Sequence, residues 1–232
     1  MSIDFIRSIL DKYFPHPKSF LDHKDPFTFL IAVMLSARCT DKRVNQITPL
    51  LFAKASTPEE MAELPLSVIK DIIQPCGLSP AKSKAIRETS FLIVHKYKGV
   101  VPQTFEELES LPGVGHKTAS VLMVQAFGKP ALPVDTHIYR LARRWGLSSH
   151  KSVKKVEEDL KKLLPPASWH NVHLQMIEAG RSFCPARGHI IEKCPICSVL
   201  VQEIAPSGSK SPKARKKASP HRKKSAPSRK VK

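Results

Sequence analysis

The stretch LPGVGHKTASVL, residues 111–122, places a glycine turn directly before the start of a helix. Three interpretations of it compete. A phosphate loop of the G-x-x-x-x-G-K-[ST] type is excluded because His116 separates Gly115 from Lys117, and because the preceding segment reads as helix, not strand. A plain turn with an incidental lysine and a helix-hairpin-helix motif remain.

The flanking sequence favours the helix-hairpin-helix. A short helix is predicted over about residues 105–110 and a second over about residues 116–127, so the motif covers about residues 105–127. In such a motif the turn Gly113-Val114-Gly115 lets backbone N–H groups approach a DNA phosphate at the start of the second helix. By itself the motif indicates binding to the DNA backbone and no chemistry.

Length and composition suit a folded protein without a membrane segment. The 232 residues, with 41% hydrophobic content, suffice for one large core or two small ones. The longest apolar run, residues 29–35, is far shorter than the roughly 20 residues of a membrane helix. The N-terminal MSIDFIRSIL has no signal-peptide core. We expect a cytoplasmic, nucleoid-associated bacterial protein whose five cysteines are reduced or metal-bound.

The chain is strongly basic, and the charge is uneven. Net charge is +18, and the residues after Glu203 hold 11 Lys/Arg and no acid. Residues 1–204 hold 27 Lys/Arg against 20 Asp/Glu. This excess favours nucleic acid as a partner over a merely solubilising surface. The Pro-, Ser- and Lys-rich segment 206–232 is predicted to be a disordered basic tail. It could be a nuclear localisation signal, but a nonspecific DNA tether is the simpler interpretation.

Helical patterns dominate the rest of the chain. Residues 26–37, PFTFLIAVMLSA, are apolar on nearly every side, as in a helix buried within a core. Thr57 and Glu60 have capping-box spacing, and Ser79 before Pro80 is typical of an N-cap. No alternating strand pattern and no repeat stand out. We therefore predict an all-α fold.

A second landmark is VDTH, residues 134–137, which precedes the helical run IYRLARRWGL. Asp is a common N-cap, so Asp135 is expected to cap that helix. The same carboxylate can still face an active site.

Three motifs, LPGVGHKTASVL, VDTHIYRLARR and GRSFCPARGH, resemble the endonuclease III family of the helix-hairpin-helix superfamily in their order and spacing. The resemblance extends from the N-terminal helix to about residue 200. It implies two domains: a helical barrel at residues 20–129 that ends in the hairpin, and a second helical domain of residues 1–19 and 130–200 with the cysteine loop 184–197. DNA and the target base are expected in the cleft between them.

Members of this family are DNA glycosylases with lyase activity at abasic sites. By resemblance, Lys117 occupies the position of the lysine that attacks the sugar C1′ and forms a Schiff base, and Asp135 that of the catalytic aspartate. The resemblance therefore implies removal of damaged, oxidised pyrimidines from duplex DNA and cleavage 3′ to the abasic site by β-elimination. An ordinary lysine is neutral in only about one molecule in 2,500 at pH 7. A helix N-terminus, burial and nearby cations lower the pKa of a lysine, whereas a close carboxylate raises it.

The resemblance also assigns contacts to DNA. The target base must leave the duplex, and a side chain must fill the gap. Arg38 aligns with a glutamine that wedges into the duplex in the family, and Leu78 aligns with a second wedge. Arg38 departs from that pattern, and a phosphate contact is an equal alternative for it. The hairpin and VDTH residues expected to bind DNA are Leu111, Gly113, Val114, Gly115 and His137.

Three cysteines fall within 14 residues: Cys184, Cys194 and Cys197. The family binds a 4Fe–4S cluster through C-x6-C-x2-C-x5-C, but here the first gap is nine residues and the fourth position is Glu203. The resemblance implies a 4Fe–4S cluster at these cysteines. His189 could supply a fourth ligand, and a Cys₃His set would also suit zinc. A metal-free loop with free thiols is the remaining alternative. Cys39 and Cys76 are expected in the core.

Two other functions compete with the lyase. The first is an adenine-specific mismatch glycosylase of the same superfamily, a group that generally lacks a lysine nucleophile where this chain has Lys117. The second is a noncatalytic DNA-binding module that uses the hairpin and the tail. All three functions have double-stranded DNA as the partner, and for the lyase this DNA contains damaged bases or abasic sites. We expect the lyase to be a monomer and to bind no membrane.

Overall fold

The computed structural model describes residues 2–204, with side chains described up to residue 200. No strand occurs among these residues, so the predicted all-α fold is confirmed. The predicted basic tail, residues 206–232, lies outside the described part of the chain. No helix within residues 2–204 is long and apolar enough to cross a membrane.

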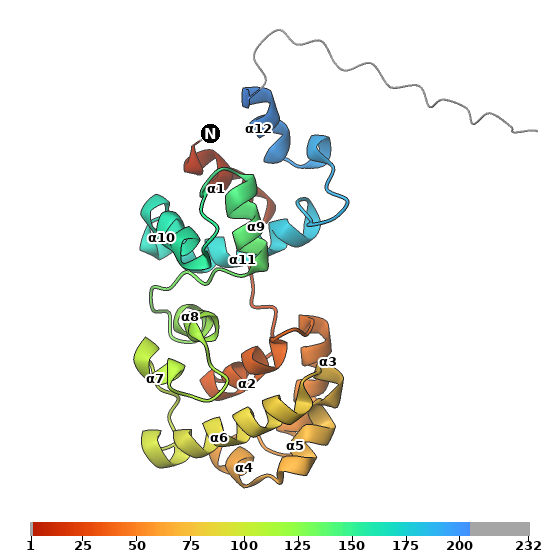
Figure 1. Ribbon diagram of the computed structural model, residues 1–232, viewed down its shortest axis with the longest axis vertical. Coiled ribbons are helices and arrows are strands. Elements are labelled where there is room, and N and C mark those ends of the chain that lie inside the picture. The colour runs from red at the N-terminus through yellow and green to blue at the C-terminus, as the bar shows by residue number, and fades with distance from the viewer. Residues whose placement is uncertain (1, 205–232) are drawn as a thin grey trace, which may run out of the picture.

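The elements are arranged in two groups along the long axis of the molecule (Figure 1). The α-helices are α1 (Ile3–Tyr13), α2 (Pro26–Ser36), α3 (Asp41–Phe52), α4 (Pro58–Glu63), α5 (Leu66–Ile73), α6 (Ser79–Tyr97), α7 (Phe105–Glu109), α8 (His116–Gln125), α9 (Thr136–Arg144), α10 (Val153–Leu163), α11 (Trp169–Ser182) and α12 (Cys197–Ile204). The 3₁₀ helices are η1 (Gln74–Cys76), η2 (Pro166–Ser168) and η3 (Ile191–Lys193).

Each group of helices packs around its own hydrophobic core. The first core collects buried apolar side chains between Leu21 and Ala131, and α2 to α8 surround it. The second collects those between Leu132 and Cys197, together with two residues of α1. We call the two halves the first lobe and the second lobe. The chain crosses between them twice, once after α1 and once after α8.

The first lobe packs around α2. Asp25 caps this helix, because its Oδ1 accepts a hydrogen bond from the Thr28 N–H at 2.8 Å. Every residue from Phe27 to Leu35 is buried, so the predicted buried helix is confirmed. A helix that is apolar on all sides is stable only inside a core, and α3, α6 and α8 enclose this one.

The sequence signals for helix starts were right at one position and wrong at another. Thr57 and Glu60 form the predicted capping box at α4. The predicted N-cap at Ser79 is wrong, because α6 already includes Ser79 and Leu78 is its N-cap. Leu78 has a left-handed backbone conformation with φ 54°, which ends the preceding turn. The tertiary packing of this turn, and not the local preference of serine, therefore decides where α6 starts.

The second lobe packs around α11. Helices α9 and α1 lie against it, and the contact with α9 is close at Gly180. A Cβ atom at position 180 would come within 2.7 Å of the His137 Nδ1 atom. Glycine therefore lets α9 approach α11 closely, and this approach fixes the direction in which the first turn of α9 points.

Candidate active site

The predicted hairpin is present. Its helices are α7 and α8, and the turn between them is closed by a hydrogen bond from the Val114 N–H to the Leu111 carbonyl at 3.1 Å. Gly113 has φ +77°, and a Cβ atom there would lie 2.9 Å from the Cβ of Ala85. Leu111 and Val114 turn their side chains into the first core. These two predicted DNA contacts could therefore be made only through the backbone.

The start of α8 offers a free backbone donor. Gly115 is the N-cap of α8, and no hydrogen bond within residues 2–204 uses its N–H group. The positive end of the helix dipole lies at the same place. This combination is a general anion-binding arrangement, which suits a DNA phosphate.

A cavity of about 220 Å³ brings together the two predicted catalytic residues. Lys117, on the first turn of α8, belongs to the first lobe, and Asp135, at the start of α9, belongs to the second. Both side chains line the cavity, although 18 positions separate them in the sequence. The apolar part of the wall includes Phe29, Val33 and Ile177. The cavity thus offers an amine and a carboxylate beside a surface on which a flat ring could rest.

Asp135 has a structural role as well as a place in the cavity. It is the N-cap of α9, and its Oδ1 accepts a hydrogen bond from the Ile138 N–H at 2.8 Å. Within the described residues no hydrogen bond uses the other carboxylate oxygen, Oδ2. The helix therefore fixes the orientation of the carboxylate, and one oxygen remains for chemistry.

A buried histidine, His173 of α11, completes the wall behind this pair. Its side chain is 2% exposed, and its Nδ1 lies 3.0 Å from the Pro133 carbonyl. Burial lowers the pKa of His173 to about 4, although Asp135 opposes the shift. The ring is therefore neutral at pH 7, Nδ1 carries the proton that it donates to Pro133, and Nε2 is an acceptor.

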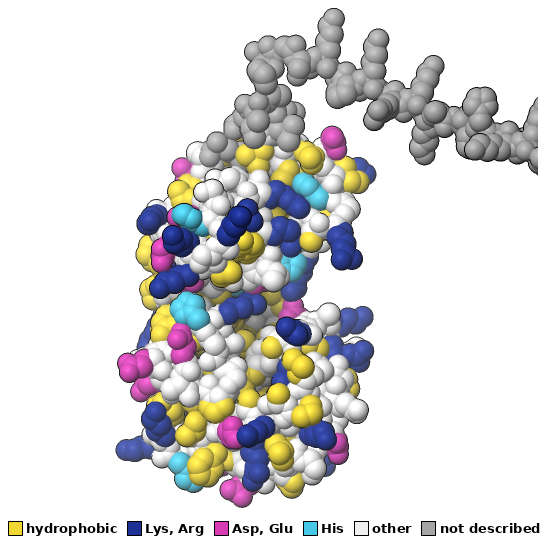
Figure 2. Space-filling model, viewed as in Figure 1, with side chains coloured by type: hydrophobic (Ala, Val, Ile, Leu, Met, Phe, Trp, Pro, Cys, Tyr) yellow, Lys and Arg dark blue, Asp and Glu magenta, His cyan; other side chains and the backbone are white. Residues whose placement is uncertain are grey.

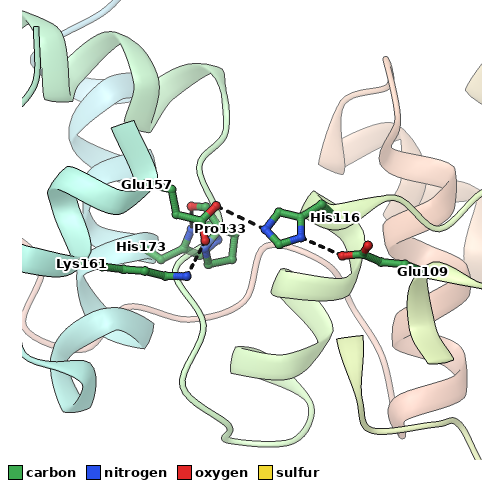
Figure 3. Close-up of polar contacts among 6 residues, drawn as sticks. All are labelled: Glu109, His116, Pro133, Glu157, Lys161 and His173. Carbon is green, nitrogen blue, oxygen red and sulfur yellow. Dashed lines mark hydrogen bonds and ion pairs between the residues drawn. The ribbon is translucent and has the colours of Figure 1, made fainter. Parts of the chain in front are cut away.

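His116 joins the start of α8 to both lobes (Figure 3). Its Nδ1 lies 2.7 Å from Glu109 Oε1 of α7, and its Nε2 lies 3.4 Å from Glu157 Oε2 of α10. Glu157 is buried and also accepts from Lys161 at 2.5 Å. The residue next to Lys117 is thus held from two sides, which orients the first turn of α8 toward the cavity.

The cavity wall also includes Arg181, Asp41 and Gln125, for which the sequence patterns predicted no role. Arg181 of α11 donates to Asp41 Oδ2 of α3 at 2.5 Å and so bridges the lobes at the cavity. The Oε1 atom of Gln125 is buried, and it has no hydrogen-bond partner in the described part of the chain. The two members of the ion pair are 140 positions apart, which explains why sequence spacing did not reveal them.

The two predicted wedge residues share an unusual backbone. Arg38 has φ 55° and Leu78 has φ 54°, both left-handed, and Leu78 is exposed. Non-glycine residues rarely adopt this conformation, which costs on the order of 1 kcal/mol or more and recurs at functional sites. Arg38 also lines the cavity. The structure therefore places one predicted wedge at the cavity and the other on a strained, exposed turn.

One buried lysine ties these two turns together. The Nζ of Lys82, on α6, donates to the Leu35 carbonyl at 2.8 Å and to the Cys76 carbonyl at 2.9 Å. Its side chain is only 7% exposed, and burial lowers its pKa. Leu35 precedes the turn with Arg38, and Cys76 precedes the turn with Leu78. Lys82 therefore sets the separation between the two turns.

His137 does not line the cavity. It is half-buried between α9 and α11, and its Nδ1 lies 3.3 Å from an Arg140 nitrogen. Burial lowers its pKa. Its predicted contact with DNA stays a prediction.

The three loop cysteines and His189 converge. One ligand atom from each of Cys184, His189, Cys194 and Cys197 lies within 4.8 Å of the other three. The Nε2 atom of His189 is buried and has no hydrogen-bond partner among the described residues. A buried polar atom without a partner is costly unless something binds it. This set of donors is therefore compatible with a metal or iron–sulfur site. The other two cysteines lie in the first lobe, Cys76 in its core and Cys39 against it.

Comparisons with known proteins agree with this geometry. Residues 31–166 match the model of the HhH-GPD superfamily base excision DNA repair proteins. Endonuclease III of Bacillus subtilis is 40% identical over 198 residues, which cover 85% of this chain and 90% of that protein. A solved structure of a non-covalent endonuclease III–DNA complex superimposes with a TM-score of 0.82 at 38% identity, covering 87% of this chain and 96% of the other. A trapped covalent endonuclease III–DNA intermediate gives a TM-score of 0.80 at 40% identity, with 84% and 94% covered.

The fold and the site thus define a base excision repair enzyme with the HhH-GPD fold. Within that superfamily the chain belongs to the endonuclease III family. The predicted class of enzyme, a DNA glycosylase with abasic-site lyase activity, is confirmed, and the two competing functions are not favoured.

The hairpin glycines allow a matched test. Gly113→Ala should lower the free energy of unfolding by about 1–3 kcal/mol, because the new methyl group would meet Ala85 in a strained backbone. Gly115→Ala meets no atom within 4 Å, so it should lose only the preference of the N-cap for glycine over alanine, about 0.5–1 kcal/mol, yet weaken DNA binding because its Cβ crowds the free N–H. Urea unfolding and duplex-binding titrations measure both. Equal stability of the two variants would contradict this account.

Lys82→Met should separate the two strained turns. Each carbonyl left without its donor costs about 1–3 kcal/mol, so the melting temperature should fall. Affinity for a duplex with an abasic-site analogue should fall more than affinity for undamaged duplex. The matched control is Lys84→Met, two positions along α6, where the lysine is exposed and forms only a 3.8 Å pair with Glu88. Equal losses for both duplexes would show that Lys82 does not act through the wedge turns.

Proposed function

We propose that this enzyme removes damaged, oxidised pyrimidines from duplex DNA, with Lys117 as nucleophile and Asp135 as its acid–base partner. One observation carries the proposal: the two residues come from different lobes and line one cavity. A duplex that lies along the junction of the lobes would present its extruded base to both. Figure 2 shows a notch between the lobes with Lys and Arg side chains on both of its sides, which suits the DNA backbone.

The reaction starts at the sugar of the damaged nucleotide. The Lys117 amine, as the free base, attacks C1′ while the C1′–N bond to the damaged base breaks, and the base leaves with the bonding electrons and a proton. Ring opening gives an imine between Nζ and C1′. Loss of a proton from C2′ then expels the 3′ phosphate, and water hydrolyses the imine to return the amine. We assign no step to the cysteine cluster.

Asp135 and His173 prepare the amine. The free Oδ2 of Asp135 can take the proton of Lys117 and can offset positive charge on the sugar as the base departs. A neutral His173 adds an acceptor without adding a positive charge next to the ammonium. The two groups would therefore orient the amine toward C1′ rather than toward solvent.

The remaining residues serve the extruded base. Phe29 and Val33 offer apolar wall, and the unpaired Oε1 of Gln125 can accept a hydrogen bond from a base N–H. Arg38 and Leu78 would fill the gap in the duplex. Arg38 lines the cavity, and Leu78 is exposed on a turn that Lys82 ties to the turn of Arg38. Since its substrate is duplex DNA and its relatives are bacterial, we place the enzyme on the nucleoid in the cytoplasm of a bacterium.

Lys117→Gln should abolish strand cleavage and covalent trapping by borohydride, because an amide cannot form an imine. Binding to the duplex should stay within a few-fold, since the hairpin backbone makes the phosphate contacts. The matched control is Lys129→Gln, which removes a half-buried lysine that donates to the Gln103 carbonyl and does not line the cavity. Trapping of the Lys117 variant at the rate of the parent enzyme would refute the assignment.

The Asp135→Asn substitution keeps the N-cap of α9 and removes the negative charge, so it distinguishes the two roles of Asp135. Asparagine caps a helix about as well as aspartate, so the melting temperature should change little, whereas turnover on an abasic-site duplex should fall by roughly 10²–10⁴-fold. Asp135→Ala should lose the same turnover and in addition about 1 kcal/mol of stability. If the Asn variant kept the turnover of the parent enzyme, Asp135 would be a cap alone.

A further inference from the structure

We infer that Cys184, His189, Cys194 and Cys197 form a site for a single zinc ion, in the place where the family pattern has a four-cysteine iron–sulfur cluster. The inference does not depend on the reaction proposed above. It rests on the distances between the ligand atoms, on the unpaired nitrogen of His189 and on the groups that surround the site.

The spacing of the ligand atoms fits one tetrahedral ion. With zinc–sulfur bonds of about 2.3 Å, two sulfurs of a tetrahedral site lie about 3.8 Å apart. The Cys184 and Cys197 Sγ atoms are 3.7 Å apart, and all four ligand atoms lie within 4.8 Å of one another. A cubane with one iron behind each thiolate needs sulfurs on the order of 6 Å apart. An iron–sulfur cluster would therefore require this loop to open.

The fourth donor points to the same ion. The His189 Nε2 atom is buried and finds no hydrogen-bond partner in the described chain, and one nitrogen of this ring lies within 4.8 Å of the three sulfurs. Three thiolates and one imidazole are a common structural zinc set, whereas structural iron–sulfur sites prefer four thiolates. His189 also lies inside the enlarged gap between the first two cysteines. The longer loop therefore brings in the ligand that the chain lacks at Glu203.

Neighbouring donors complete the surroundings of a thiolate site. The Arg144 Nη1 lies 3.3 Å from Cys184 Sγ, and the Cys197 N–H lies 3.4 Å from Cys194 Sγ. Zinc with three thiolates and a neutral imidazole carries one net negative charge, which the Arg144 guanidinium offsets. Such outer contacts hold ligands in position and typically change metal affinity by 10–100-fold.

The metal content of the native protein tests the inference directly. The full chain should be purified without oxygen from cells supplied with both iron and zinc salts, and zinc, iron and acid-labile sulfide should be measured per chain. We expect close to one zinc, little iron or sulfide, and no visible colour. Stoichiometric iron and sulfide with a brown colour would overturn the inference. Absence of both metals, with no zinc uptake on titration, would also overturn it.

Cobalt reports the geometry of the site. After zinc is removed with a chelator, Co²⁺ should bind in a single step and produce the intense visible bands of a tetrahedral ion with thiolate ligands. Absence of these bands, or the weak bands of a six-coordinate ion, would count against a Cys₃His site.

Variants of His189 test the fourth ligand. His189→Ala should weaken zinc binding by more than about tenfold in competition with a chromophoric chelator, and His189→Cys should restore it. The matched control is His16→Ala, an exposed histidine far along the chain from the loop, which should leave binding unchanged. Unaltered affinity in the Ala variant would overturn the Cys₃His assignment. If His189→Ala does not fold, His189→Cys and the metal content of the native protein still test the Cys₃His assignment.

Discussion

The proposed catalytic pair is divided between two hydrophobic cores, and the rest of the site depends on how those cores are held together. Lys117 is fixed to the first core by α8, and Asp135 to the second by the cap of α9. The polar contacts described between the lobes are few: His116 with Glu157, and Arg181 with Asp41. The Arg181–Asp41 pair is partly exposed, and pairs of that kind contribute about 0–1 kcal/mol. In the other contact the Glu157 carboxylate is buried. A duplex that contacts both lobes would add to these contacts in holding the catalytic pair in place.

The same division explains why strained turns are concentrated on one side of the site. Arg38 and Leu78 both keep left-handed backbones in the first lobe, and a single buried ammonium, Lys82, binds a carbonyl before each turn. Its two charge-assisted hydrogen bonds offset the cost of those backbones. Both left-handed turns therefore belong to the lobe that carries Lys117.

The sequence predicted the elements with strong local signals. The glycine turn indicated the hairpin, and the apolar residues 26–37 indicated the buried α2. It could not predict pairs that only the tertiary fold brings together, such as Arg181 and Asp41. The preference of serine for the N-cap also predicted the wrong start for α6. The N-cap is Leu78, and the packing of its turn sets its backbone conformation. His173 carries no motif at all, and its role depends on burial, which spacing alone does not reveal.

Helix α9 connects the cysteine loop to the proposed catalytic carboxylate. Asp135 caps its first turn, while Arg140 and Arg144 in its last turns donate to the Cys184 carbonyl, and Arg144 also to the Pro185 carbonyl at 2.9 Å. Because these arginines need fixed acceptors, the loop must be closed for α9 to hold its register. That requirement concerns the positions of two carbonyls and not the chemistry of a particular metal. A single ion that closes the loop would meet this requirement, and the carboxylate at the other end of α9 would keep its place.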